Sequence, residues 1–143
     1  MTPEAKGQRQ AFQFYGRRKG RRLREGRRSL VDTLLPKLSV PIPQEPGATL
    51  DPRALFDAPR EIWLEIGFGG GEHLAAQAER HPEIGFIGCE VFENGVAKLL
   101  GEIERRGLAN VRVLANDARP LLAALTPRSI GRGQDPSVAA LPR

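Results

Sequence analysis

The stretch Glu61-Ile-Trp-Leu-Glu-Ile-Gly-Phe-Gly-Gly-Gly71 decides the fold of this chain. It begins as a short apolar run with a tryptophan, carries an acid at Glu65, and ends with four glycines in five residues. Such a run predicts a buried strand that turns sharply into a helix, with backbone amides free to face a ligand. We therefore expect the ligand of this protein, whatever its nature, to bind at this turn.

The segments after this turn alternate between strand and helix patterns. Apolar runs predict strands at 62–66, 85–90 and 111–114. Amphipathic stripes predict three helices: one at 72–80, a second that is capped by Asn94 and ends at Gly107, and a third at 120–125. Tight loops between such elements require parallel strands with right-handed crossovers. The predicted fold class is α/β, with a doubly wound, Rossmann-like parallel sheet of which only the first β-α-β-α-β half is present.

Composition divides the chain into four expected segments. These are a basic flexible arm (1–29), a proline-rich connector with a short helix starting at Asp51-Pro52 (30–60), the Rossmann-like half domain (61–125) and an irregular tail (126–143). A doubly wound domain needs a fourth strand on the other side of the first strand. Because the tail contains no strand pattern, we expect that edge of the first strand to be unpaired.

Positive charge is concentrated in the arm. The net charge is +5, but residues 1–28 carry ten Lys or Arg against two Glu, and the rest of the chain carries more acids than bases. Arginines pair with phosphates and release counterions, so a polyanion is the expected partner of the arm. The candidate RNA-binding residues are Arg17, Arg18, Lys19, Arg21 and Arg22. The alternative is a solubilising tail that has no partner.

Several other classes of protein find no support in the sequence. No apolar run approaches the ~20 residues of a membrane span, and the N-terminus is basic and polar, unlike a secretory signal. The single cysteine, Cys89, excludes an internal disulfide and fits a reducing cytoplasm; we expect it to be a buried, inert thiol. His73 and His81 have no partners at metal-ligand spacing. We expect a cytoplasmic protein with no membrane or metal partner.

The glycine spacing discriminates between two nucleotide cofactors. The dinucleotide fingerprint G-x-G-x-x-G would need glycine at position 72, where this chain has Glu72. The spacing E-x-G-x-G-x-G from Glu65 instead matches the first motif of methyltransferases that use S-adenosylmethionine. A glutamate at the helix N-terminus repels a pyrophosphate but is compatible with the cationic ammonium and sulfonium of S-adenosylmethionine. We therefore predict S-adenosylmethionine as the cofactor, with a nicotinamide dinucleotide as the disfavoured alternative.

Two further acids follow the next predicted strands. Glu90 ends the second strand, near the offset at which an acid meets ribose hydroxyls, and Asp117 follows the third, where it can reach the adenine edge. All three acids should stand at the carboxyl ends of adjacent parallel strands. The alternative for each acid alone is a helix cap or a solvated loop. The predicted cofactor site comprises Glu65, Gly67, Gly69, Glu90 and Asp117.

Five stretches of the chain together resemble the bacterial tRNA (guanine-N7-)-methyltransferase family. They are Phe14-Tyr-Gly-Arg-Arg18, Leu50-Asp-Pro-Arg-Ala-Leu-Phe56, Trp63-Leu-Glu-Ile-Gly-Phe-Gly-Gly-Gly-Glu-His73, Gly88-Cys-Glu-Val91 and Asn116-Asp-Ala118, within a similarity that runs through roughly residues 12–125. The resemblance implies that Glu65, Glu90 and Asp117 contact S-adenosylmethionine and that the basic arm holds tRNA. The implied product is 7-methylguanosine at position 46, in the variable region of tRNA.

The chain departs from this family after about residue 125. The family's Pro-Asp-Pro-Trp-Pro-Lys-Lys-Arg-His motif, which includes the acid assigned a catalytic role, is absent, and Asp135 in Gln134-Asp-Pro136 is not equated with that acid. No catalytic residue is therefore assigned. We expect a truncated chain or a shifted reading frame near Leu125, with weak or no activity. The alternative function is a non-catalytic or partner-dependent RNA-binding module.

Overall fold

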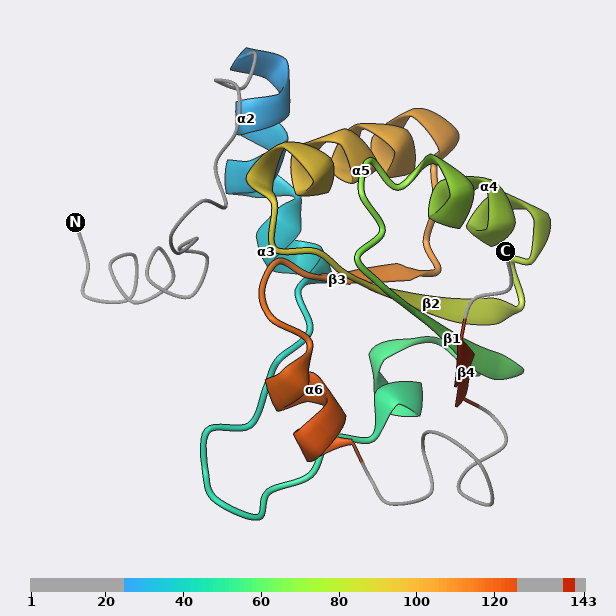
Figure 1. Ribbon diagram of the computed structural model, residues 1–143. Coiled ribbons are helices and arrows are strands. Elements are labelled where there is room, and N and C mark those ends of the chain that lie inside the picture. The colour runs from blue at the N-terminus through green and yellow to red at the C-terminus, as the bar shows by residue number, and fades with distance from the viewer. Residues whose placement is uncertain (1–24, 126–137, 141–143) are drawn as a thin grey trace.

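A computed structural model describes residues 25–125 and 138–140, and Figure 1 shows their arrangement. The strands are β1 (Glu61–Ile66), β2 (Ile84–Cys89), β3 (Val111–Leu114) and β4 (Val138–Ala140). They form one parallel sheet in the order β3-β2-β1-β4. The predicted α/β class with a parallel sheet is therefore confirmed.

Helices connect and cover these strands. They are α2 (Glu25–Thr33), α3 (Leu35–Leu38), the 3-10 helix η1 (Pro52–Leu55), α4 (Glu72–Arg80), α5 (Glu93–Arg106) and α6 (Arg119–Ala124). The bounds of α4 and β3 are those expected, whereas β1, β2 and α6 each begin one residue earlier than expected. Gly107 ends α5 in a left-handed conformation, as predicted. None of the helices in the described part of the chain is long and apolar enough to cross a membrane.

Two apolar clusters fill the two sides of the sheet. On one side Phe86 of β2 packs with residues of α4 and α5, such as Leu74 and Leu99. On the other side Ile62 of β1 packs with Leu121 of α6. Figure 1 shows α4 and α5 on one face of the sheet and α6 on the other. Because helices cover both faces, the carboxyl ends of the strands form the edge at which such sheets bind ligands.

The sheet contains a strand that the sequence pattern did not predict. β4 pairs in parallel with β1, with Val138 opposite Ile62 and Ala140 opposite Leu64. The expectation that no strand remained for this edge of β1 is therefore wrong. Three residues make too short a run for periodicity to separate a strand from a loop. The other tail residues, 126–137 and 141–143, lie outside the described residues.

Helix α2 begins inside the segment that was expected to be a flexible arm. It packs against α5, and its residues Leu30 and Val31 contact the apolar cluster on that side of the sheet. Residues 25–29 are thus helical rather than flexible, although Arg27 and Arg28 remain exposed. Positive charge therefore continues from the arm onto a helix that is packed on the body. The candidate RNA contacts at positions 17–22 lie outside the described residues.

Candidate cofactor site

The turn after β1 uses three glycines with left-handed backbones. Gly67, Gly69 and Gly71 have φ angles of 72°, 63° and 74°, which residues with a Cβ rarely adopt. A Cβ on Gly67 or Gly69 would meet no atom within 4 Å, whereas a Cβ on Gly71 would lie 2.7 Å from Cδ1 of Leu99. The first two glycines therefore leave the backbone facing open space, and the third allows the start of α4 to pack against α5.

The first turn of α5 lies directly against this glycine turn. A Cβ built on Gly95 would lie 2.1 Å from the carbonyl oxygen of Gly69. One turn further along α5, Lys98 covers Gly70 and forms an ion pair of 2.7 Å with Glu72. Gly95 was not among the predicted site residues, although a glycine inside a helical pattern is a signal of close packing.

Glu90, the residue after β2, binds three backbone amides. Its Oε1 accepts a hydrogen bond from Gly69 N at 2.8 Å, and its Oε2 accepts from Val91 N at 2.8 Å and from Phe92 N at 3.1 Å. Bonds to a carboxylate are stronger than those between neutral groups. Glu90 therefore joins the end of β2 to the glycine turn and to the start of α5. The N-cap residue of α5 is Phe92, so the prediction that Asn94 caps this helix was wrong.

Asp117 follows β3 and is paired with the first residue of α6. The Oδ1 atom of Asp117 accepts a hydrogen bond from Arg119 N at 2.8 Å, and Oδ2 accepts one from Arg119 Nε at 2.8 Å. The side chain of Arg119 is 88% exposed and that of Asp117 is 29% exposed. This ion pair with Asp117 raises the pKa of the Arg119 guanidinium. Arg119 therefore stays charged, and the pair lies where solvent and ligands can reach it.

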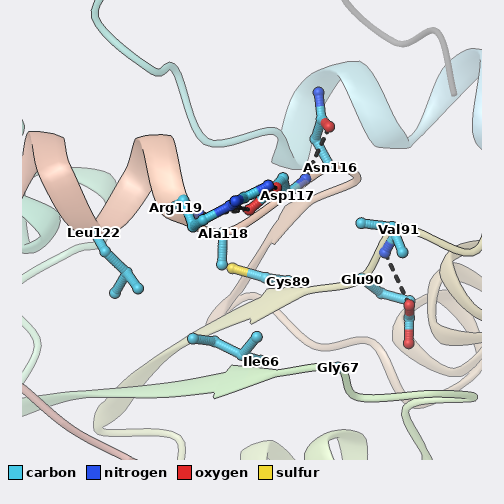
Figure 2. Close-up of a pocket in the computed structure, with 10 residues that line it drawn as sticks. All are labelled: Ile66, Gly67, Cys89, Glu90, Val91, Asn116, Asp117, Ala118, Arg119 and Leu122. Atoms are coloured by element: carbon cyan, nitrogen blue, oxygen red, sulfur yellow. Dashed lines mark hydrogen bonds and ion pairs between the residues drawn. The ribbon is translucent and has the colours of Figure 1, made fainter. Parts of the chain in front are cut away.

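A pocket of about 440 Å³ opens at the carboxyl ends of β1, β2 and β3. Figure 2 shows its lining: Ile66, Gly67, Cys89, Glu90, Val91, Asn116, Asp117, Ala118, Arg119 and Leu122. Three of the five predicted cofactor residues, Gly67, Glu90 and Asp117, are among them. Gly69 is not, but it is held beside the pocket by its bond to Glu90. The structure therefore brings most of the predicted site together.

Glu65 is the predicted site residue that lies apart from the pocket lining. It is within β1, opposite Gly88 of β2, and its Oε2 atom is buried. Successive side chains of a strand point to opposite faces, so Glu65 and the pocket-lining Ile66 lie on different faces of the sheet. Glu65 therefore stands behind the glycine turn, on the side of the sheet that α4 and α5 cover.

Exposed apolar side chains border the carboxylates of the pocket. Ile66 is 52% exposed and Leu122 is 41% exposed, although both are large hydrophobic residues. Cys89, which also lines the pocket, is buried, and this burial raises the pKa of its thiol to about 12. The thiol is therefore protonated near neutral pH and is a poor nucleophile. The pocket combines an apolar wall with two carboxylates, which suits a ligand with a flat apolar part and several polar groups.

Within residues 25–125 and 138–140, no group of three or more His, Cys, Asp or Glu side chains is placed to hold a metal ion. His81 lies 3.6 Å from Glu83 at the surface. The polar groups that line the described pocket are backbone amides, the carboxylates of Glu90 and Asp117, the carboxamide of Asn116 and the guanidinium of Arg119.

Comparisons with known proteins show what the chain is similar to. Residues 59–133 match the family described as "Putative methyltransferase". The chain is 54% identical to the tRNA (guanine-N(7)-)-methyltransferase of Paramagnetospirillum magneticum over 121 residues, which are 83% of this chain and 50% of that protein. It is 54% identical to the enzyme of the same name from Rhodospirillum rubrum, over 78% of this chain and 45% of the relative.

The chain thus spans about half the length of the curated relatives that it matches. The family match covers the glycine turn, the pocket and all five predicted cofactor residues. This chain therefore belongs to that methyltransferase family.

Proposed function

We propose that this chain contributes the cofactor-binding part of a tRNA (guanine-N7-)-methyltransferase that uses S-adenosylmethionine and works in the cytoplasm. The observation that carries the proposal is that the open glycine turn, Glu90 and Asp117 converge on one pocket at the ligand edge of the sheet. The names of the relatives support the choice of tRNA and of guanine N7.

The residues of the pocket fit S-adenosylmethionine better than they fit a phosphorylated cofactor. The volume of about 440 Å³ lies within the roughly 300–1,000 Å³ typical of small-molecule sites. Open space over Gly67 and Gly69 allows a ligand to approach the backbone closely. The lining carries two carboxylates, Glu90 and Asp117, against the single guanidinium of Arg119, so its net negative charge favours a cationic ligand over a pyrophosphate. S-adenosylmethionine, when bound, supplies a methyl group on a positively charged sulfur.

Methylation at guanine N7 demands alignment more than acid–base chemistry. N7 carries a lone pair that is already nucleophilic, so no residue has to remove a proton before the attack. The task of the chain is then to hold the two reactants in line, which by itself accelerates a reaction strongly. Glu90 serves this task by fixing the glycine turn, and Ile66 gives the pocket an apolar wall on one side.

The basic arm is the proposed tRNA contact. Arg17, Arg18, Lys19, Arg21 and Arg22 supply the charge for phosphate binding. Exposed Arg27 and Arg28 on α2 extend this charge onto the body of the protein. Contacts of this kind weaken as salt increases, because counterions are released on binding.

Single-turnover methyl transfer tests the proposal. The chain is mixed in excess over tRNA with S-adenosylmethionine, and nucleosides are analysed by mass spectrometry. We expect slow formation of 7-methylguanosine, and none on a tRNA whose target guanine is replaced by 7-deazaguanine. Methylation of the 7-deaza tRNA would contradict the assignment of N7. Binding of tRNA without any binding of S-adenosylmethionine would instead support a non-catalytic RNA-binding module.

A further inference from the structure

Arg119 is the only cation among the described residues that line the pocket. It lies at the rim, at the start of α6, and its side chain is 88% exposed. Figure 2 shows its guanidinium alongside the carboxylate of Asp117. An exposed cation at the rim of a pocket with two carboxylates does not help to bind a positively charged cofactor, which suggests a second, anionic ligand.

The ion pair engages both carboxylate oxygens of Asp117. Arg119 Nε lies 2.8 Å from Oδ2 and 3.1 Å from Oδ1, and Nη2 lies 2.5 Å from Oδ2. The guanidinium therefore competes for the same oxygens that a ligand's N–H groups would use. Ion pairs between exposed side chains contribute little to stability. A stronger partner for the guanidinium can therefore displace it from Asp117.

We infer, on the basis of the proposed function, that Arg119 exchanges Asp117 for a phosphate of the bound tRNA. Guanidinium groups bind phosphate with two parallel hydrogen bonds, so the exchange replaces one two-point contact by another. Oδ2 of Asp117 can then accept a hydrogen bond from the cofactor, while Oδ1 keeps its bond from Arg119 N. Arg119 is thus a positioning residue that couples the two ligands: tRNA raises the affinity for S-adenosylmethionine, and S-adenosylmethionine raises the affinity for tRNA by the same factor.

The test compares Arg119→Ala, Arg119→Lys and a control, Arg105→Ala. Arg105 is also exposed and also paired with an acid, Glu102 at 2.5 Å, but it lies in the last turn of α5. Because α5 leads from the end of β2 to the start of β3, its last turn lies at the amino ends of the strands, whereas the pocket lies at their carboxyl ends. Calorimetry gives the affinity for S-adenosylmethionine with and without saturating tRNA. Filter binding gives the affinity for tRNA as a function of salt.

In the unchanged chain, saturating tRNA should tighten S-adenosylmethionine binding by about two- to fivefold, the range expected for releasing an exposed ion pair. In Arg119→Ala this effect of tRNA should vanish, and the affinity for S-adenosylmethionine without tRNA should equal or exceed that of the unchanged chain. The salt slope, which is the slope of log affinity for tRNA against log salt concentration, should fall in magnitude by about 1. Arg119→Lys should restore the salt slope, and Arg105→Ala should behave like the unchanged chain.

Three results would overturn the inference. An unchanged salt slope and unchanged coupling in Arg119→Ala would show that Arg119 does not touch tRNA. Loss of S-adenosylmethionine affinity in Arg119→Ala without tRNA would make Arg119 a ligand of the cofactor instead. Failure of the unchanged chain to bind S-adenosylmethionine would overturn the proposed function, and this inference with it.

Discussion

Oε1 of Glu90 accepts a hydrogen bond from the backbone nitrogen of Gly69 at 2.8 Å, which ties two loops that are 21 residues apart in the chain. The other carboxylate oxygen binds the amides that lead into α5. One side chain thus sets the positions of the turn after β1 and of the helix after β2. The shape of the pocket depends on this connection, and the first prediction follows from it.

Replacing Glu90 should loosen the glycine turn. Glu90→Gln keeps an oxygen for Gly69 N but loses the charge and one of the two acceptor oxygens, and Glu90→Ala loses every bond. A hydrogen bond to a charged group contributes about 1.5–3 kcal/mol when both partners are well shielded. Because these bonds are exposed, we expect Glu90→Ala to lower the free energy of unfolding by a smaller amount, about 1–2 kcal/mol. Urea denaturation measures it. A Glu90→Gln variant less stable than Glu90→Ala would contradict this account.

Two glycines of α5 should respond in opposite ways to alanine. Gly95→Ala places a Cβ where only 2.1 Å separates it from the carbonyl oxygen of Gly69, so α5 or the turn has to move. Gly101→Ala, six residues along the same helix, meets nothing within 4 Å. Alanine is favoured over glycine in a helix by about 1 kcal/mol. We therefore expect Gly101→Ala to raise the melting temperature and Gly95→Ala to lower it. A stabilising Gly95→Ala would show that the turn is not packed against α5.

Alanine substitutions at two glycines of the turn should separate the cost of backbone strain from the cost of a side-chain clash. Gly67→Ala adds a side chain at a φ of 72° but into open space, and it should cost about 1 kcal/mol of stability. Gly71→Ala adds the same strain and a contact of 2.7 Å with Leu99, so it should cost several kcal/mol in total. Denaturation of the two variants side by side checks the order. Equal losses would mean that Leu99 gives way without cost.

The thiol of Cys89 should make the protein sensitive to alkali. Burial raises its pKa from 9.0 to about 12, so the folded state holds this proton more tightly than the unfolded state does. Above pH 9 the unfolded chain loses the proton first, and stability should fall by up to about 1.4 kcal/mol per pH unit until the folded thiol ionises. Denaturation between pH 8 and pH 11 should show a steeper fall in the unchanged chain than in Cys89→Ala. Parallel curves would contradict the burial of this thiol.

Much of the fold followed from periodicity, and the exceptions have physical causes. β2 was recognisable because all six of its residues are buried and its apolar run is nearly continuous. The three residues of β4 carry no comparable pattern, and their pairing with β1 depends on a partner distant in the chain. The start of α2 was missed because arginines and a glycine dominate it, whereas its packing on α5 comes from Leu30 and Val31 further along.

The site was predictable where backbone geometry demands a residue type. Gly67 and Gly69 were predicted from the spacing of glycines after β1, and both have left-handed backbones. Glu90 and Asp117 were predicted from their places after β2 and β3. Arg119 was not selected, because its place at the pocket comes from an ion pair that sequence spacing alone does not reveal. The orientation of Glu65, away from the pocket lining, depends on the pleat of β1 rather than on its closeness to the glycines.

Calorimetric titration with S-adenosylmethionine measures directly whether the pocket binds this cofactor. We expect one site per chain in the unchanged protein, an affinity that falls by about tenfold or more in Glu90→Ala, and an unchanged affinity in Gly101→Ala. A tenfold change corresponds to about 1.4 kcal/mol. A nicotinamide dinucleotide should give no heat of binding. No binding of S-adenosylmethionine, or equal affinity in the unchanged chain and Glu90→Ala, would contradict the account.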